Sequence, residues 1–450
     1  MKSHIFREYD IRGTVPDELN ETTVRLLGNA MAAYYLEKGA KRISLGRDCR
    51  SSSPEFSSWL SRALVESGLE VVDIGMAPTP VLNFSVHHLR LDGGIQITGS
   101  HNPPAYNGFK ISLGEMPVYG EEVQKIRQIA ETGDFRTGTG AIEKTDVTGA
   151  YIDYVVESIR PGPVGRKVVV DGGNGVGGPI GVRIYRRLGF ETIPLFCEPD
   201  GAFPNHHPDP TIPENLNALM RRVIEAEADL GIAFDGDADR IGVVGAQGDI
   251  IWGDQLLIVF SRDLLTRHPG AAVIGEVKCS QTLYDDVAAY GGRAIMWKAG
   301  HSPVRQKMKD EGALLAGEMT GHIFFKERYL GYDDAIYAGA RLLEILSKTD
   351  QRIESLLSGV PPMAVTPEIR VDCPDDRKFA VVAAIAEEFK KTHDVIDIDG
   401  ARVRLNGGWG LVRASNTQPA LVLRFEATDA TRLEEIRRLF MDKVENQLHV

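Results

Sequence analysis

The sequence predicts an α/β protein of three topologically similar α/β domains with mixed sheets and a smaller C-terminal α+β domain, with an active site in a central cleft. The first observation is an internal repeat, because a unit of strand, turn, helix, glycine cap and second strand occurs three times in 450 residues. The second is that a third apolar run follows each unit and leads into a polar loop. Three equivalent domains should therefore direct three equivalent loops to one shared place.

Each repeat is built from the same elements in the same order. Short β-rich runs predict the opening strands, at residues 42–45, 167–170 and 272–274. Glycine then caps the helix and leads into the second strand, at residues 68–72, 189–193 and 291–295. With the boundaries set between repeats, we expect domains at residues 1–143, 144–250 and 251–361.

The remainder, residues 362–450, has a different pattern. It follows a linker marked by Pro361-Pro362, near which we expect the fourth domain to hinge. Strands are predicted at residues 369–371, near 403–405 and at 421–425, and helices at 379–390 and 431–445. These elements make a small α+β domain.

Residues 98–110, T-G-S-H-N-P-P-A-Y-N-G-F-K, form the most informative stretch. Asn-Pro-Pro excludes helix and strand, and Asn-Gly adds a turn, so the whole stretch is expected to be a loop. It follows a short β-rich run, which sets Ser100 at the carboxyl end of a strand, where open α/β sheets bind ligands. Ser100 is therefore a candidate nucleophile, with His101 and Lys110 nearby, unless it is an idle serine on a surface turn.

A second loop supplies a partner for this serine. Three carboxylates at alternate positions, with glycine between them, can converge on a hard cation such as Mg²⁺, and they are Asp235, Asp237 and Asp239. An EF-hand loop also begins D-x-D-x-D, but its sixth position would be Gly rather than Arg240 and its twelfth Glu rather than Ala246. Mg²⁺ beside a serine indicates phosphoryl chemistry, to which Arg240 could add a second positive charge.

Two further segments complete a pattern. They are residues 317–322, G-E-M-T-G-H, and residues 413–417, R-A-S-N-T. With the opening F-R-E-Y-D-I-R-G at residues 6–13, the loops occur in the order of the four signature loops of the α-D-phosphohexomutases, which this chain resembles over nearly its whole length. Met319 resembles the bacterial phosphomannomutase/phosphoglucomutase group, whereas phosphoglucosamine mutases usually carry Gln there. Two positions depart from the family pattern, Gly99 where Ala is common and Thr320 where Ser is usual.

The resemblance implies an intramolecular phosphotransferase. It would interconvert hexose 1-phosphate and hexose 6-phosphate of mannose, glucose or both, through a phosphoserine and a hexose 1,6-bisphosphate that reorients. Mg²⁺ would be the cofactor and glucose 1,6-bisphosphate the activator. Phosphoglucosamine mutase and sugar-phosphate phosphatase are the alternatives, and a non-enzymatic sugar-phosphate sensor is a third.

The family pattern also implies roles for individual residues. The catalytic set would be Ser100, His101, Lys110, Arg240 and His322, with Lys110 and His322 as the two candidates for the general base. The metal would be held by Ser100, Asp235, Asp237 and Asp239. Glu318 and Thr320 would bind sugar hydroxyls, Arg413, Ser415, Asn416 and Thr417 the non-transferred phosphate, and Tyr9, Arg12, Lys278, His301 and His322 the rest of the substrate.

Other binding motifs are weak or absent. Residues 173–178, G-N-G-V-G-G, follow a predicted strand and fit G-x-G-x-x-G, the dinucleotide pattern. No clear ribose-binding acid follows at the tip of the next strand, so a glycine-rich turn that allows close packing is favoured. The sequence has no G-x-x-x-x-G-K-[ST] loop, which argues against an ATP-dependent kinase.

Composition sets the remaining expectations. A net charge of -12 disfavours nucleic acid and anionic membranes as partners. The four cysteines form no C-x-x-C pair, the start lacks the apolar core of a secretory signal, and no run reaches the roughly 18 apolar residues that span a bilayer. We expect a cytoplasmic enzyme of hexose phosphates, a monomer or a weak homo-oligomer.

Overall fold

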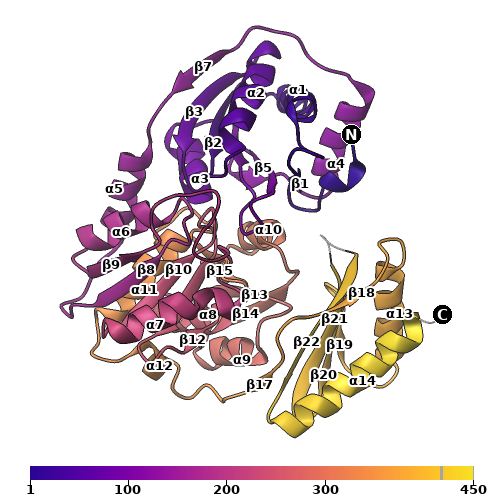
Figure 1. The fold of residues 1–450 in the computed structure, drawn as a ribbon. Coiled ribbons are helices and arrows are strands. Elements are labelled where there is room, and N and C mark those ends of the chain that lie inside the picture. The colour runs from indigo at the N-terminus through magenta and orange to yellow at the C-terminus, as the bar shows by residue number, and fades with distance from the viewer. Residues whose placement is uncertain (416–418, 449–450) are drawn as a thin grey trace.

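The computed structural model describes residues 1–415 and 419–448 and contains four β-sheets, each with its own helices (Figure 1). The indigo and purple part carries the first sheet, the magenta and orange parts the second and third, and the yellow part the fourth. Asn416 and Thr417, two of the predicted phosphate-binding residues, lie outside the described residues.

The first sheet has the strand order β1-β5-β4-β2-β3-β7, with β6 paired to β5. Its strands are β1 (Ile11–Thr14), β2 (Arg42–Arg47), β3 (Glu70–Met76), β4 (Gly93–Ile97), β5 (Tyr106–Leu113), β6 (Met116–Pro117) and β7 (Ala141–Lys144). Its helices are α1 (Glu21–Glu37), α2 (Ser53–Glu66), α3 (Thr79–His88) and α4 (Glu121–Thr132), after a short 3-10 turn at Ser3–Ile5.

The second sheet has the order β12-β11-β10-β8-β9. Its strands are β8 (Lys167–Asp171), β9 (Glu191–Leu195), β10 (Leu230–Phe234), β11 (Ile241–Gly245) and β12 (Ile250–Ile251). The helices of this part are α5 (Thr148–Ser158), α6 (Gly178–Arg187) and α7 (Asn217–Glu225), with a 3-10 turn at Pro213–Leu216.

The third sheet has the order β14-β13-β15-β16. Its strands are β13 (Ala272–Glu276), β14 (Arg293–Trp297), β15 (Leu315–Gly317) and β16 (Ile323–Phe325). The helices are α8 (Gly253–Arg267), α9 (Gln281–Ala289), α10 (His301–Glu311), α11 (Ala335–Leu346) and α12 (Ile353–Leu356).

The repeat predicted from sequence is present in all three sheets. Each contains the same four-strand order, with the second strand beside the first, then the third, then a fourth: β3-β2-β4-β5, β9-β8-β10-β11 and β14-β13-β15-β16. The first three strands are parallel and the fourth is antiparallel, so the sheets are mixed. The predicted glycine caps adopt positive φ, 103° at Gly68, 92° at Gly189 and 78° at Gly291, a conformation that costs glycine little.

The C-terminal part is a single antiparallel sheet with two long helices, as Figure 1 shows in yellow. Its strands are β17 (Ala364–Val365), β18 (Ile369–Asp372), β19 (Val395–Ile396), β20 (Ala401–Leu405), β21 (Gly408–Ala414) and β22 (Ala420–Ala427). Its helices are α13 (Lys378–Lys390) and α14 (Ala430–Leu448). The predicted α+β class is confirmed, and β21 is a long central strand that the sequence reading did not identify.

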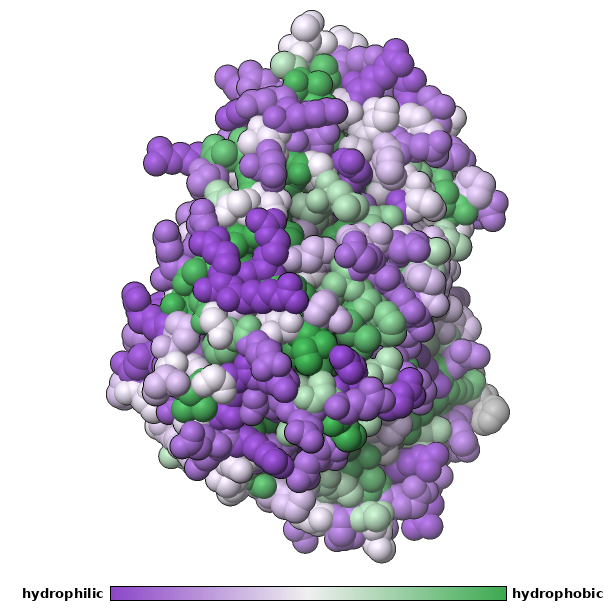
Figure 2. Space-filling model, turned by 60° about the vertical axis from the view of Figure 1, so that its left-hand side comes forward, coloured by the Kyte–Doolittle hydropathy of each residue, from purple (hydrophilic) through white to green (hydrophobic). Residues whose placement is uncertain are grey.

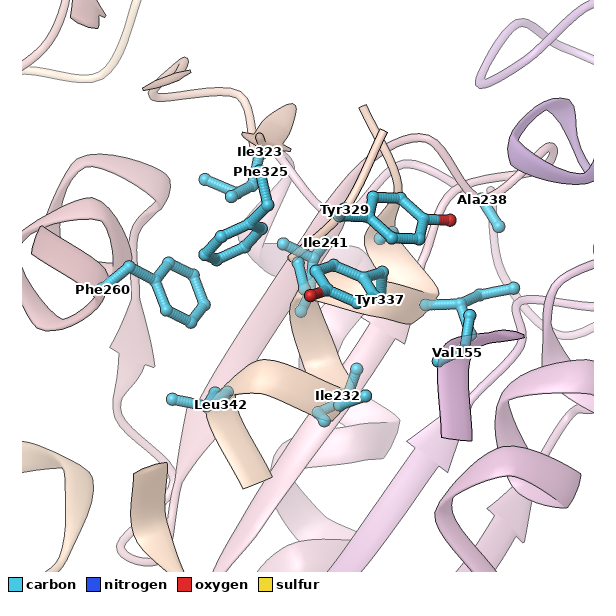
Figure 3. Packing of buried hydrophobic residues seen from close by; sticks show 14 of the residues in the cluster. Val155, Ile232, Ala238, Ile241, Phe260, Ile323, Phe325, Tyr329, Tyr337 and Leu342 are labelled. Carbon is cyan, nitrogen blue, oxygen red and sulfur yellow. The ribbon is translucent and has the colours of Figure 1, made fainter. Parts of the chain in front are cut away.

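The hydrophobic cores explain how these parts are joined. One cluster of buried side chains runs from β3 and α3 through the second and third sheets to α12. Figure 3 shows its centre, where Ile232 of β10 and Leu342 of α11 approach the rings of Phe325 and Tyr337. The C-terminal part has a separate core between its sheet and α13 and α14. The first three repeats therefore share packed apolar surface, whereas the C-terminal part has its own core and meets the third part through a small cluster of Val277, Ala299, Trp409 and Leu411.

The surface has the mixed character expected of a chain with 25% charged residues. On the face shown in Figure 2, hydrophobic residues lie in small groups among hydrophilic ones. Among the described residues, no helix combines the length and the apolar character required to cross a membrane.

Candidate active site

Three loops meet at the carboxyl ends of β4, β10 and β15, as the repeat predicted. The hydroxyl of Ser100 donates a hydrogen bond of 2.8 Å to Oδ2 of Asp235, although the two residues are 135 positions apart. His101 Nδ1 lies 3.1 Å from the same hydroxyl oxygen. Ser100 is buried and has a φ of 47°, a left-handed conformation that costs a non-glycine residue about 1–2 kcal/mol. The surrounding contacts must therefore hold the serine in place.

The acidic loop is buried and its carboxylates converge. One oxygen each from Asp235, Asp237 and Asp239 lies within 4.8 Å of the others. Lys110 Nζ lies 2.6 Å from Oδ2 of Asp237 and also contacts Asp239. The charge of the lysine therefore pairs with carboxylates that would otherwise repel one another.

The pKa values of these groups follow from burial and from one another. Burial and the two neighbouring carboxylates raise the pKa of Asp235 well above its ordinary value. Burial alone would raise the pKa of Asp239, but the charges of Lys110 and His322 lower it. Burial alone would lower the pKa of Lys110, but Asp237, Asp239 and Asp235 raise it. In this arrangement Lys110 holds its proton firmly.

The acidic loop fits a hard divalent cation. Oδ1 of Asp237 and Oδ1 of Asp239 are buried oxygens with no hydrogen-bond partner among the described residues. A buried carboxylate oxygen without a donor is costly, and a cation would satisfy it. Oxygen donors of this kind are the ligands that Mg²⁺ prefers. The residues present therefore fit the predicted metal.

The prediction of a continuous loop over residues 98–110 is wrong in its second half. Tyr106 begins β5, and Lys110 pairs with Gln96 of β4 in an antiparallel ladder. Asn-Gly makes no turn here, because Gly108 lies opposite Arg12 of β1, so close that an added Cβ would lie 2.3 Å from the carbonyl of Ile11. Glycine allows the neighbouring strand to approach, and the strand carries Lys110 into the metal loop.

A pair of stacked histidines lies on the other side of the acidic loop. Arg240 Nε donates a hydrogen bond of 3.0 Å to Nε2 of His322, and His322 Nδ1 lies 2.9 Å from Oδ2 of Asp333. Burial alone would lower the pKa of His322, but the carboxylates of Asp239 and Asp333 raise it. His301 stacks on His322 with ring centroids 5.4 Å apart, and burial lowers its pKa. Because Nε2 of His322 accepts from Arg240, the ring proton of His322 lies on Nδ1, towards Asp333.

His101 and Arg12 lie beside Ser100 and its neighbour Gly99. Burial lowers the pKa of His101 well below its ordinary value, and the charges of Arg240 and Arg12 lower it further. Arg12 Nη1 donates to the carbonyl of Gly99 at 3.3 Å and to the side chain of Asn102. A neutral histidine and a fixed guanidinium thus flank the serine.

A short segment at residues 299–300 links several predicted substrate-binding groups. Tyr9 donates its hydroxyl to the carbonyl of Ala299 at 2.8 Å, and the amide of Gly300 donates to Oε1 of Glu318 at 2.6 Å. The amide of Ala299 donates to Oδ2 of Asp399 in the C-terminal part at 2.9 Å. Groups from the first, third and fourth parts of the chain are therefore joined here. Thr320 follows Glu318 by two residues in the same turn and is partly exposed.

The predicted phosphate-binding residues that the structure describes lie in the C-terminal part. Arg413, in β21, donates from Nε to Oδ2 of Asp399 at 3.1 Å and from Nη2 to Oδ1 at 3.2 Å. Ser415 is buried, and its carbonyl accepts a bond of 2.6 Å from Lys378. Lys278 lies opposite, on the third part, with its Nζ 3.5 Å from Glu368. Burial alone would lower the pKa of Lys278, but Glu276 and Glu368 raise it.

A small open pocket lies beside Lys110 and the acidic loop. Its lining includes Tyr9, Lys110, Asp239 and His301, together with Asp333, which the sequence reading did not single out. The pocket lies beside the acidic loop, where the first, second and third parts of the chain meet. Lys110 and His301 both face this pocket.

The glycine-rich segment at residues 173–178 serves close packing, as favoured from sequence. A Cβ added at Gly175 would lie 2.7 Å from the carbonyl of Gly236, and one at Gly177 would lie 2.4 Å from Cβ of Ala238. The segment therefore supports the acidic loop from behind.

Several residues around the site were missed from sequence: Asp48, Arg50, Glu276 and Asp333, which are buried, and Asp399, which is partly buried. Two of them carried a signal, because the first strand of each repeat ends at an acid: Asp48 directly after β2, Asp171 in β8 and Glu276 in β13. Because the signature loops gather at the carboxyl ends of the strands, an acid at the end of the first strand of a repeat can be predicted to lie beside the site. Asp333 and Asp399 carried no local signal.

Family models and relatives agree with this arrangement. Four models match the chain in order: phosphoglucomutase/phosphomannomutase alpha/beta/alpha domain I at residues 3–137, domain II at 149–248, domain III at 252–363 and the C-terminal domain at 368–443. The chain is 46% identical over 445 residues to a phosphomannomutase/phosphoglucomutase from Pseudomonas aeruginosa, which covers 99% of this chain and 96% of that protein.

Two further relatives extend the comparison. A phosphoglucomutase from Neisseria gonorrhoeae is 45% identical over 452 residues, covering 99% of this chain and 98% of that protein. The crystal structure of a phosphoglucomutase/phosphomannomutase family protein from Burkholderia thailandensis superimposes with a TM-score of 0.93 at 41% identity, covering 99% of this chain and 98% of that one.

Proposed function

The chain belongs to the phosphoglucomutase/phosphomannomutase family of intramolecular phosphotransferases, and from this membership we propose that Ser100 carries the phosphoryl group that the enzyme moves between O1 and O6 of a hexose. The observation that carries the proposal is the contact of 2.8 Å between the Ser100 hydroxyl and Asp235, at the edge of a cluster of three buried carboxylates. A serine in that position can hold a phosphoryl group against a cation held by the acids.

The reaction proceeds in two balanced transfers. In the first, O6 of a hexose 1-phosphate attacks phosphoserine 100; the P–Oγ bond breaks, and a hexose 1,6-bisphosphate forms. The bisphosphate then reorients, and Ser100 Oγ attacks the phosphorus at O1, so that the hexose 6-phosphate leaves and the phosphoserine is restored. Glucose 1,6-bisphosphate acts as activator because it can phosphorylate a free Ser100 by the second step.

Asp235, Asp237 and Asp239 would hold Mg²⁺ together with an oxygen of the phosphorylated Ser100. The bound cation supplies neutralisation of phosphoryl charge, which favours a loose transition state. Arg240 and Lys110 add fixed positive charge on the same side. His101 contacts the serine oxygen at 3.1 Å and orients it.

The attacking hydroxyl must lose a proton as the new P–O bond forms. Lys110 and His322 are the two candidates for the general base, and each lies beside the acidic loop. Lys110 could accept a proton only once a bound cation had taken over its carboxylate partners, because these carboxylates raise its pKa. The ring of His322 is held by neighbouring side chains on both sides, since Arg240 contacts its Nε2 and Asp333 faces its Nδ1. These contacts fix the orientation of His322, and the ring can accept a proton when its Nε2 exchanges the bond from Arg240 for one from the substrate hydroxyl.

Substrate recognition must work in both orientations of the bisphosphate. Glu318 and Thr320 would bind a pair of hydroxyls that look alike after the turn, presented as O3 and O4, which leaves the configuration at C2 weakly read. Arg413 and Ser415 would hold the non-transferred phosphate with the adjoining Asn416 and Thr417. Tyr9, Arg12, Lys278 and His301 would line the path of the turning intermediate. Both mannose and glucose phosphates are then substrates.

A direct test compares wild type with Ser100→Ala in a coupled assay with Mg²⁺ and catalytic glucose 1,6-bisphosphate. We expect wild type to isomerise glucose 1-phosphate and mannose 1-phosphate, and the variant to lose at least about a thousandfold in kcat, as loss of a covalent nucleophile does. Intact-protein mass should show one phosphate on wild type and none on the variant. An active Ser100→Ala enzyme would exclude the phosphoserine.

A further inference from the structure

We propose that Arg50, held by Asp48, is a positioning residue that fixes Ser100 for phosphoryl transfer. The inference rests on the proposed role of Ser100 as the phosphate carrier. It concerns two residues that lie outside the four signature loops, on the segment between β2 and α2. Neither touches the substrate pocket lining.

Arg50 is fully enclosed by the serine loop. Its side chain is 0% exposed, and every N–H of its guanidinium has an acceptor. Nε donates to Oδ2 of Asp48 at 3.1 Å. Three of the other four donors reach carbonyls of the loop between β4 and β5, Ser100 at 2.8 Å, Asn102 at 2.6 Å and Pro103 at 2.7 Å, and the fourth reaches the carbonyl of Tyr106, the first residue of β5, at 2.9 Å. One planar group thus ties together the backbone on both sides of the nucleophile.

Asp48 fixes the arginine and the loop at once. Its Oδ2 also accepts the amide of Gly99 at 3.1 Å, and its Oδ1 accepts the amide of Arg50 at 3.0 Å and the hydroxyl of Ser53 at 2.6 Å. The residue before the nucleophile is therefore bound to the same carboxylate as the arginine. Gly99 leaves room for this, since an added Cβ would lie 2.5 Å from Cζ of Arg50.

The nucleophile needs such support because its own backbone is strained. Ser100 has a φ of 47°, and such conformations persist where the surroundings over-determine them. Its carbonyl, which accepts from Arg50, lies against the acidic loop, where a Cβ added at Gly236 would be 2.5 Å from it. Arg50 therefore sets the orientation of the serine and its distance from the acids together.

The same device occurs in the other repeats. In each, the acid at the end of the first strand accepts the amide two residues further on: Arg50 at 3.0 Å from Asp48, Gly173 at 2.9 Å from Asp171, and Lys278 at 2.7 Å from Glu276. Asp48 and Glu276 also accept an amide from a signature loop, Gly99 at 3.1 Å and Met319 at 3.3 Å. The first repeat differs in one respect. There the residue whose amide is bound, Arg50, also donates from its side chain to four backbone carbonyls, and among the described residues neither Gly173 nor Lys278 does so.

The test compares Arg50→Lys with a matched control, Arg166→Lys. Arg166 is also buried, donates to Asp229 at 2.8 Å and to several backbone carbonyls, and lies at the amino end of β8, on the far edge of the sheet from the acidic loop. Lysine keeps the charge in both variants but cannot bind four carbonyls in one plane. The readouts are kcat, KM and the single-turnover transfer of phosphate from glucose 1,6-bisphosphate to Ser100, followed by intact-protein mass.

We expect Arg50→Lys to lower kcat and the single-turnover rate about a hundredfold with KM within about threefold, as misplacement of a reacting group by about 1 Å does. Arg166→Lys should lose stability yet keep both rates within about twofold of wild type. Equal transfer rates in the two variants would overturn the inference. Should Arg50→Lys not fold, Asp48→Asn applies the same test, because its amide would face the donors of Arg50 and Gly99; an unchanged rate there is equally negative.

The same experiment separates this inference from the proposed function. A wild-type enzyme that turns over without ever carrying phosphate on Ser100 would exclude the phosphoserine mechanism itself. A wild-type enzyme with phosphate on Ser100, beside an Arg50→Lys variant that matches Arg166→Lys, would exclude only the positioning role.

Discussion

Asp399 is the residue whose replacement best tests how the phosphate-binding side is organised. Its carboxylate holds Arg413 at 3.1 and 3.2 Å and accepts the amide of Ala299, from the third part of the chain, at 2.9 Å. Arg413 uses Nε and Nη2 for this pair. Asp399 therefore orients the arginine and also helps to join the C-terminal part to the rest of the protein.

The expected effect of Asp399→Ala can be worked from these contacts. Freeing Arg413 means that it must be ordered when substrate binds, at a cost of about 1 kcal/mol. Losing the bond from the Ala299 amide, which goes to a charged acceptor, removes about 1 kcal/mol or somewhat more from the closed arrangement. Together these give about 2 kcal/mol, or roughly a thirtyfold increase in KM. Because the non-transferred phosphate is held equally in ground and transition states, kcat should change by less than about threefold.

The assay is steady-state isomerisation of glucose 1-phosphate, with Asp397→Ala as control. Asp397 lies in the same loop, is exposed and pairs with Lys390 at 2.8 Å, so its loss should leave both constants unchanged. A KM below that of wild type would refute the reasoning, since it would mean that Asp399 competes with phosphate for Arg413. A fall in kcat with an unchanged KM would refute it as well.

Three other predictions concern Thr320 in the turn at residues 317–322, the contact of His206 with Asp171, and the packing of the glycine-rich segment at residues 173–178. Thr320→Ser keeps the hydroxyl and removes one methyl, worth about 0.8 kcal/mol at most, so kcat/KM for glucose and mannose 1-phosphates should change by less than about fivefold. Burial alone would lower the pKa of His206, but Asp171, 3.0 Å away, raises it, so this pair stabilises the fold fully below the ordinary histidine pKa and progressively less as pH rises through the raised value. His206→Gln should therefore lower Tm more at about pH 5.5 than at about pH 8.5, and a difference in Tm that grows with pH would contradict this. Gly177→Ala should destabilise the protein by about 1–3 kcal/mol in urea unfolding through overpacking, whereas Gly149→Ala, with open space around it in α5, should leave stability unchanged or slightly higher; equal effects would show that the segment is not tightly packed.

Much of the fold was determined by local sequence patterns. Short β-rich runs, glycine caps and their threefold repetition predicted three related α/β units, because each unit recurs in the same order along the chain. The C-terminal sheet was predicted less completely. Its strand β21 was missed because Gly408-Trp409-Gly410 reads as a turn, while in the structure Trp409 is buried and its indole donates to Glu426 at 2.8 Å.

Some residues of the candidate site could likewise be predicted from sequence, and the positions of others could not. Ser100 and the three aspartates could be predicted because each group lies in one short motif whose chemistry requires those residue types at that spacing. That Lys110 lies on a strand, pairing with Asp237 and Asp239, could not, since its position depends on how closely β1 approaches Gly108. Local composition reports a turn there, and the neighbouring strand overrides it.

The sequence by itself determined the chemistry of this protein, and the tertiary structure decided the support for that chemistry. A nucleophile or a metal ligand is recognisable from its neighbours in the chain, because the reacting group and its loop are contiguous. The contacts of Asp333 with His322, of Asp399 with Arg413 and of Arg50 with the carbonyl of Ser100 each join residues from different elements of the fold, 14 residues apart for Asp399 and Arg413 and 50 apart for Arg50 and Ser100. No local pattern encodes them, because they arise when packed sheets bring separate strand ends to one place.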